Sequence, residues 1–177
     1  MAQQSTQSTQ FTETSSFSRL VRTTHSEHGT SIFAPDEHLT PFAPFPPKRS
    51  AFTVFDMRQS VPVNNMEAVP SFANTLPRCS PQGAVFATSQ IEAGDSSPMH
   101  RTHSIDYVFV LSGEIVLALD GGEEKTVKAG EFIVQQGANH SWINRTELPC
   151  KFLCVMLGAE KVVLQDGTVL EETVFKK

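Results

Sequence analysis

Short β-prone segments separated by glycine-containing turns constrain the fold of this chain most strongly. The turn pairs Asp120-Gly121 and Asp166-Gly167 are typical of tight hairpins because glycine tolerates positive φ. Regularly spaced short strands joined in this way favour an antiparallel sandwich or barrel. No long helical period is visible, although a helix in the first third of the chain stays possible. The strands expected after Gln82 are residues 84–90, 106–111, 114–119, 125–128, 132–135, 140–144, 150–157, 161–164 and 168–174.

The chain divides into three parts by composition. Residues 1–18 are rich in Ser, Thr and Gln and poor in apolar side chains, so we predict a disordered polar tail. Residues 19–80 form an irregular N-terminal arm with short strands, and residues 81–177 form the barrel.

The arm contains strand candidates at residues 31–33 and 51–55. The proline-rich residues 41–47 cannot pair as a central strand because proline lacks the amide donor. They are expected to lie extended on the surface or on a partner. Residues 56–80 either drape over the barrel or fill its mouth, and the sequence leaves both alternatives open.

Composition excludes several classes of partner. The 177 residues carry a formal net charge of −5, which disfavours nucleic-acid binding. No apolar run reaches membrane-spanning length, and the N-terminus lacks a secretory pattern. The three cysteines, Cys79, Cys150 and Cys154, have no CxxC spacing and are expected to be reduced. Cys150 and Cys154 are predicted core residues, and the predicted location is cytoplasmic.

Two polar side chains, one before the strand expected at residues 106–111 and one at its start, are separated by an even number of positions. Strand side chains alternate between two faces, so His100, Asp106 and the apolar Val108 face the same way in a regular segment. If the strands fold back on each other, His140 converges on the same point. Two imidazoles and one carboxylate are the ligand set of many divalent-metal sites.

The first of two motifs resembles that of the cupins. In that family a glycine, five residues and His-x-His are followed by a glutamate and, six residues later, by a second glycine. Gly94, His100, Asp106 and Gly113 fall at these offsets. The chain resembles small single-domain cupins of the conserved-barrel type, which implies an antiparallel double-stranded β-helix, or jelly-roll, barrel.

The second motif of the family is matched by Gly130, Gly137, His140 and Asn144, with one residue fewer before Gly137. The two motifs together cover roughly residues 82–157. The residues within the two motifs resemble those of a cupin subgroup from microbial and fungal natural-product pathways.

Three departures from the family pattern affect the implied metal site. Thr102 stands where the second histidine is expected, His103 comes one position late, and Asp106 replaces the glutamate. His100, Asp106 and His140 still match a two-histidine, one-carboxylate site. A bulge before His103 would add that imidazole as a fourth ligand. The resemblance thus implies His100, Asp106 and His140 as catalytic residues and, with His103, as ligands of a divalent ion (zinc, iron, manganese or nickel), with Thr102, Val108 and Trp142 lining the substrate pocket.

The resemblance implies an enzyme of secondary, polyketide-like metabolism acting on a small organic substrate. A metal-assisted lyase or isomerase reaction is expected, such as decarboxylation, dehydration or enolisation. Without a metal, His140 or His100 would move a proton while Asp106 sets the tautomer. A non-haem metal dioxygenase and a non-catalytic ligand-binding cupin are the alternatives. The family also implies a homodimer.

Overall fold

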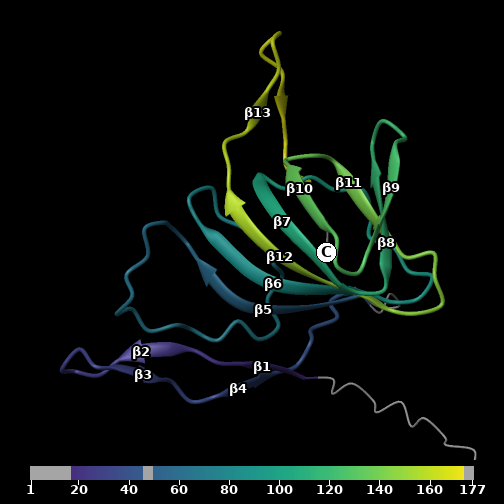
Figure 1. The fold of residues 1–177 in the computed structure, drawn as a ribbon. Coiled ribbons are helices and arrows are strands. Elements are labelled where there is room, and N and C mark those ends of the chain that lie inside the picture. Colours follow the sequence, from purple (N-terminus) through teal and green to yellow (C-terminus); the bar gives the residue numbers. More distant parts are fainter. Residues whose placement is uncertain (1–16, 46–49, 174–177) are drawn as a thin grey trace, which may run out of the picture.

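The computed structural model describes residues 17–45 and 50–173 and contains strands but no helix in these ranges (Figure 1). Accordingly, no described helix could cross a membrane. The strands are β1 (Ser18–Leu20), β2 (Thr23–His25), β3 (Ser31–Phe33), β4 (Glu37–Leu39), β5 (Ala51–Arg58), β6 (Ala84–Ile91), β7 (Ser104–Ser112), β8 (Glu114–Leu119), β9 (Glu124–Lys128), β10 (Phe132–Gln136), β11 (His140–Ile143), β12 (Cys150–Gly158), β13 (Val162–Val163) and β14 (Val169–Leu170).

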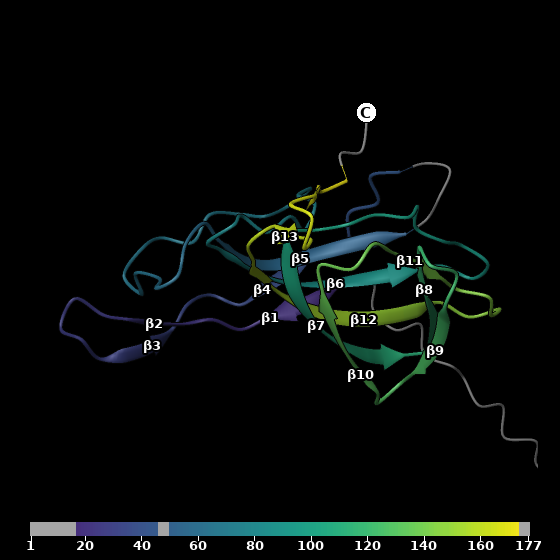
Figure 2. The ribbon, with the colours of Figure 1, turned by 90° about the horizontal axis from the view of Figure 1, so that it is seen from above.

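Two antiparallel sheets form the barrel. The larger has the order β10-β7-β12-β6-β5, and the smaller has the order β11-β8-β9. Figures 1 and 2 show the smaller sheet lying across from the larger one, with the connections β7–β8 and β10–β11 passing between them. The predicted all-β barrel is confirmed.

The expected turns close the barrel hairpins. Gly122 has φ 86° and its amide donates to the Leu119 carbonyl, which ends β8 and starts the return to β9. Gly167, with φ 82°, does the same between β13 and β14. These residues need the left-handed conformation that glycine adopts without a steric cost.

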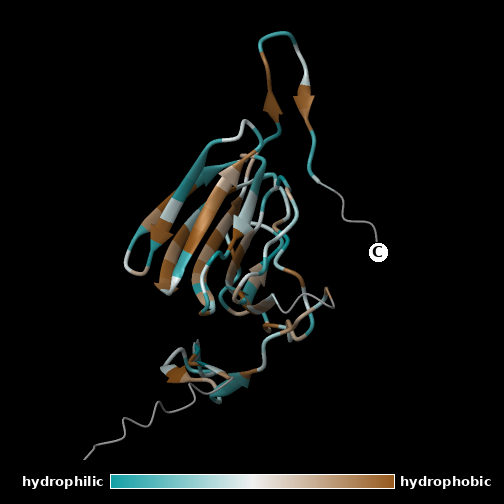
Figure 3. Cartoon of the chain, turned by 90° about the vertical axis from the view of Figure 1, so that its right-hand side faces the viewer, coloured by the Kyte–Doolittle hydropathy of each residue, from teal (hydrophilic) through white to brown (hydrophobic). Residues whose placement is uncertain are grey.

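Alternation along the strands builds the core between the sheets. Along β7 the side chains of Ser104, Asp106, Val108 and Val110 are buried, whereas Tyr107 is exposed, as its parity predicts. Figure 3 shows the corresponding apolar stretches on the barrel strands. Cys150 and Cys154 are buried free thiols of this core.

The predicted arm contributes a strand to the barrel. Residues 51–55 are part of β5, which extends to Arg58 and pairs with β6 along most of its length. The pairing is favourable because it buries Val54 and Phe55. Before β5, the pairs β1–β4 and β2–β3 form a narrow ribbon that projects from the barrel (Figures 1 and 2).

The predicted tail and the proline-rich stretch fall partly outside the described residues. Residues 1–16 and 46–49 are not described. Within the described part, β1 begins at Ser18, the last residue of the predicted tail. Phe42 forms an isolated bridge with Phe52, so the chain before the gap lies along β5.

The outer face of the large sheet is unusually apolar. Val134, Tyr107, Val155 and Phe86 stand in one row across β10, β7, β12 and β6. Beside this row, Phe132 on the edge strand β10 is 76% exposed. Contiguous exposed apolar side chains of this kind mark association surfaces.

We therefore predict a homodimer that pairs through this face. Light scattering at micromolar concentration is expected to give twice the chain mass, and the double substitution Phe132→Lys/Val134→Lys is expected to give a folded monomer. Leu148→Lys, in the exposed loop before β12, is the control and should remain dimeric. A wild-type monomer in this measurement would contradict the prediction.

Candidate functional site

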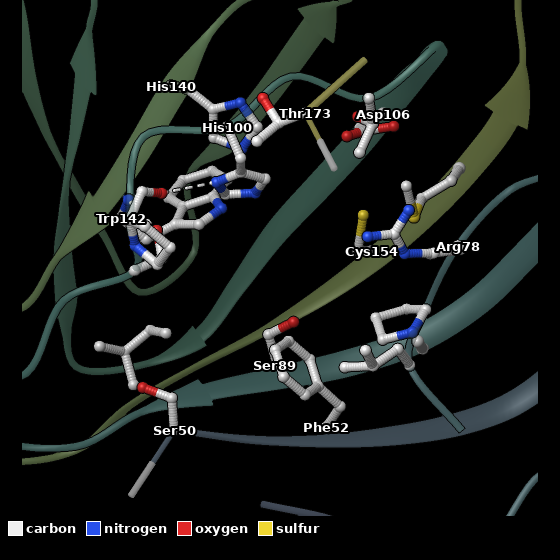
Figure 4. Close-up of a pocket in the computed structure, with 18 of the residues that line it drawn as sticks. Ser50, Phe52, Arg78, Ser89, His100, Asp106, His140, Trp142, Cys154 and Thr173 are labelled. Atoms are coloured by element: carbon white, nitrogen blue, oxygen red, sulfur yellow. Dashed lines mark hydrogen bonds between the residues drawn. The ribbon is translucent and has the colours of Figure 1, made fainter. Parts of the chain in front are cut away.

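A cavity of about 570 Å³ lies inside the barrel (Figure 4). Most of the surface that its wall exposes is apolar. Of the two alternatives for residues 56–80, the structure favours the mouth, because Leu76, Pro77 and Arg78 line this cavity. The remaining lining residues are Phe45, Ser50, Phe52, Ala87, Ser89, Ile91, Ser96, Ser97, Pro98, His100, Arg101, Thr102, Asp106, His140, Trp142, Phe152, Cys154, Met156, Glu172 and Thr173.

His100 and His140 face each other across an antiparallel bridge. The amide of each residue donates to the carbonyl of the other at 2.8 Å. Their ring centroids are 4.2 Å apart, and the rings are tilted by 47°. Because the backbones hold the pair, the spacing of the imidazoles does not depend on a bond between the rings.

Backbone carbonyls define the tautomers of both imidazoles. The Nδ1 atom of His100 lies 2.8 Å from the Pro98 carbonyl, and Nδ1 of His140 lies 3.0 Å from the Ala138 carbonyl. A carbonyl only accepts, so each Nδ1 carries a hydrogen and each Nε2 of the neutral ring is an acceptor. Asp106 was expected to set the tautomer of a histidine, but the Pro98 and Ala138 carbonyls do so instead.

Asp106 is joined to His140 through Gln135. The Gln135 amide nitrogen lies 3.3 Å from Asp106 Oδ2 and 3.2 Å from His140 Nε2. On the other side, the Ser104 hydroxyl donates to Asp106 Oδ1 at 2.6 Å and lies 3.0 Å from Thr102 Oγ1. Each carboxylate oxygen of this buried Asp106 therefore has a partner.

Burial lowers the pKa of both histidines. The pKa of His140 falls to about 4, first because burial disfavours the imidazolium and then because His100 lies beside it. Burial is also the main cause that lowers the pKa of His100, and Arg78 adds to it. Burial raises the pKa of Asp106, against the hydrogen bonds from Ser104 and Gln135. Two neutral imidazoles therefore stand beside a carboxyl group that holds a proton more readily than usual.

The lowered pKa of His140 predicts a loss of stability in acid. In the unfolded chain this imidazole binds a proton near pH 6.5, whereas the folded protein resists protonation until about pH 4. Stability is thus fully present above pH 6.5 and falls as pH drops through this window, by roughly 2 kcal/mol at pH 5 from His140 alone. The raised pKa of Asp106 acts in the opposite direction.

Comparison of wild type with His140→Asn isolates this contribution. Denaturant unfolding at pH 7 and 5 is expected to show a smaller loss in the variant, since asparagine does not titrate. His103→Asn, which changes an imidazole outside the cavity, should retain the wild-type loss. Equal pH dependence of wild type and His140→Asn would contradict the prediction.

The structure brings together most, but not all, of the sequence-predicted site residues. His100, Asp106, His140, Thr102 and Trp142 all line the cavity. The Trp142 ring packs edge-on against the His140 ring, and the centroids of the Trp142 and Phe152 rings are 4.8 Å apart.

His103 and Val108 lie elsewhere and are corrections to the predicted site. His103 does not line the cavity, and its Nε2 lies 3.1 Å from the Leu170 carbonyl. Val108 keeps the predicted inward parity but packs within the hydrophobic core, opposite Cys154, and does not line the cavity.

The described side chains do not form a ready metal-ligand set. Within residues 17–45 and 50–173, no three His, Cys, Asp or Glu side chains are grouped so that they could hold an ion. In the site, the Gln135 amide nitrogen contacts both Asp106 Oδ2 and His140 Nε2, so these two atoms already have a partner within the protein. The metal ion therefore stays a prediction.

Sequence reasoning missed two polar residues of the site. Gln135 directly opposes Asp106 in the β7–β10 register. Its side chain lies on the same face of β10 as the apolar Ile133, and this alternation was a signal in the sequence that Gln135 points inward. Arg78 comes from the irregular segment before the barrel, and no spacing rule places that segment.

Comparisons with known proteins agree with the fold. Residues 87–156 match the cupin domain family. The phomopsin biosynthesis cluster protein C' of Diaporthe leptostromiformis is 43% identical over 102 residues, which cover 56% of this chain and 53% of that protein. The cupin-domain-containing oxidoreductase fogC of Aspergillus ruber is 32% identical over 157 residues, which cover 82% of this chain and 75% of that protein.

The chain spans about half the length of the phomopsin cluster protein that it matches. Among solved structures, the polyketide cyclase RemF from Streptomyces resistomycificus is similar, with a TM-score of 0.49 and 17% identity. The matched region covers 78% of this chain and 82% of that one.

Proposed function

The chain belongs to the cupin family, and from this premise we propose that it is a small-molecule enzyme of fungal secondary metabolism. In this proposal it moves a proton at a carbon beside a carbonyl group, in a reaction of the lyase or isomerase type. The observation that carries the proposal is the facing pair of neutral imidazoles, His100 and His140, in the wall of a largely apolar cavity.

His100 is the proton acceptor in this mechanism. Its ring lines the cavity and is more accessible than that of His140, which is only 2% exposed and already accepts from Gln135. With Nδ1 held by the Pro98 carbonyl, the acceptor atom is Nε2. Because burial lowers the pKa of His100, the imidazolium formed is more acidic than an exposed one and returns the proton more readily.

Asp106 and its hydroxyl partners supply a second place for a proton. The Ser104 hydroxyl connects the carboxyl group to Thr102, which lines the cavity. Because its pKa is raised, Asp106 takes up a proton more easily than an exposed carboxylate. Removal at one position and return at another is what an enolisation or a dehydration requires.

The names of the relatives support the metabolic setting. Phomopsin biosynthesis cluster proteins of Diaporthe leptostromiformis are among them, as is oryzines biosynthesis cluster protein J of Aspergillus oryzae. The apolar walls formed by Phe52, Trp142 and Phe152 suit a substrate with a planar apolar body.

A metal-dependent oxidoreductase is the second candidate. It is favoured by the relatives from Hypocrea virens, Aspergillus ruber and Neurospora crassa, which are called cupin-domain-containing oxidoreductases. His100, Asp106 and His140 would hold the ion, which would supply redox chemistry, provided that the Gln135 side chain turned away.

Hydrogen exchange at carbon tests the proposal without knowledge of the natural substrate. The aryl ketone α-tetralone is incubated with the protein in D₂O, and loss of its α-protons is followed by NMR. We expect exchange faster than in buffer, retained after dialysis against EDTA and in His103→Asn, and lost in the double variant His100→Asn/His140→Asn. Exchange that is equal in wild type and the double variant would refute the proposal.

The same preparation discriminates the second candidate. Elemental analysis is expected to find far less than one metal ion per chain in the active protein. A stoichiometric ion that disappears in His140→Asn, together with activity that returns only on adding iron, would favour the oxidoreductase.

A further inference from the structure

A second polar group lies in the cavity, away from the imidazole pair. Arg78 and Glu172 both line it, with 3.7 Å between Arg78 Nη1 and Glu172 Oε1. Their side chains are 44% and 35% exposed, so this pair lies where the cavity meets solvent. Figure 4 shows the Arg78 side chain directed into the cavity, on the side of Asp106 and Cys154.

The pairing of Arg78 with Glu172 is loose. A separation of 3.7 Å exceeds that of a charge-assisted hydrogen bond, and partly exposed ion pairs contribute little to stability. Glu172 is nevertheless kept near by its neighbour, because the Thr173 amide donates to the Arg101 carbonyl and the Arg101 amide donates to Thr173 Oγ1. Glu172 is thus a carboxylate held beside Arg78 by the backbone, and a ligand can displace it.

Between Arg78 and the imidazole pair the cavity has largely apolar walls. Phe52, Trp142, Phe152 and Met156 line it, and the Trp142 and Phe152 rings are 4.8 Å apart. A ligand that reaches from Arg78 to His100 therefore needs an anionic end and an apolar body.

We propose that Arg78 binds the carboxylate of an apolar, ring-containing substrate, in place of Glu172. The guanidinium group matches a carboxylate in two parallel hydrogen bonds. A phosphate carries up to two negative charges and is therefore repelled by Glu172 more strongly than a carboxylate. The other lining arginine, Arg101, donates to the Gly137 carbonyl at 2.5 Å. This inference rests on the proposed function in taking the cavity as the substrate site.

The position of Arg78 gives the carboxylate a defined part in the reaction. The charge of Arg78 contributes to the lowered pKa of His100, so the two groups are within electrostatic reach. A carboxylate bound at Arg78 lies across the cavity from the imidazole pair. It serves to hold the substrate, and the carbon that loses a proton lies at the other end.

Binding of matched acid and amide probes tests the proposal. Trp142 is the only tryptophan of the chain and lines the cavity, so its fluorescence reports occupancy directly. Hydrocinnamate is expected to bind the wild-type protein about 10-fold more tightly than the isosteric neutral hydrocinnamamide. Arg78→Met should abolish this preference, and Arg78→Lys should restore part of it.

Two further measurements make the outcome decisive. Glu172→Gln removes the competing carboxylate and should tighten acid binding several-fold, which gives a reading even if Arg78→Met fails to fold. An unchanged acid–amide ratio in Arg78→Met, unchanged acid affinity in Glu172→Gln, or tighter binding of phenethyl phosphate than of the acid would overturn the assignment. His103→Asn, which changes an imidazole outside the cavity, should keep the acid preference. Failure of α-tetralone exchange with the acid preference intact would refute only the proposed function.

Discussion

Replacing His100 with asparagine is expected to lower kcat/KM for proton exchange by about 10²–10⁴-fold, the usual contribution of a general base. Asparagine can still donate to the Pro98 carbonyl, which the Nδ1 atom of His100 contacts at 2.8 Å. The bridge between residues 100 and 140 is made by backbone atoms and survives the substitution. The change therefore removes the proton acceptor while the local fold is kept, and initial rates of α-tetralone exchange measure its effect.

The effects of substituting His100 and His140 on the exchange rate should not be additive. If His100 and His140 share one proton-transfer step, the double asparagine variant loses little more than the worse single variant. His103→Asn is the matched control, since its ring contacts the Leu170 carbonyl outside the cavity and should leave the rate unchanged. Strictly additive losses, or a rate in His100→Asn within a factor of about two of wild type, would assign proton transfer to another group.

Substituting Gly158 with alanine is expected to cause the largest loss of stability. A Cβ atom there would collide with the Ser80 carbonyl oxygen and lie 2.5 Å from the carbonyl carbon of Pro81. Since those neighbours are backbone atoms, the segment must move, at a cost of about 3 kcal/mol. For a chain of this size that corresponds to a melting temperature about 6–12 °C lower, which differential scanning fluorimetry can measure.

The same substitution should weaken ligand binding. Ser80 and Pro81 follow the cavity-lining residues Leu76, Pro77 and Arg78, so pushing them away from β12 displaces the wall. Gly121→Ala is the control, because a Cβ at that turn position meets nothing within 4 Å. A Gly158→Ala protein that melts like Gly121→Ala would show that the crossing of these two segments is less tight than the structure indicates.

The barrel was predictable because its signals are local. Alternation and turn glycines each act over a few residues, so the sequence located β6 to β12 to within about two residues. The proximity of His100 and His140 was also predictable, since both lie at the ends of segments whose pairing the motifs imply.

Other parts of the site were not predictable because they depend on long-range placement. The irregular segment before β6 passes close to the end of β12, where the Gly158 amide donates to the Gly83 carbonyl. No local pattern encodes this contact, which helps to place the segment over the mouth of the cavity. His103 misled the interpretation because a histidine one position late is compatible with a bulge, and only the contact of its ring with the distant Leu170 carbonyl shows that it lies outside the cavity.

The two hydrogen bonds between Thr173 and Arg101 tie the end of the described chain to the cavity wall. They lie beyond the last strand, β14, and belong to neither barrel sheet. Loss of these two bonds would therefore release Glu172 from the wall without breaking a strand pair. We expect ligand residence time to depend on this C-terminal segment, whereas the catalytic rate depends on the imidazoles.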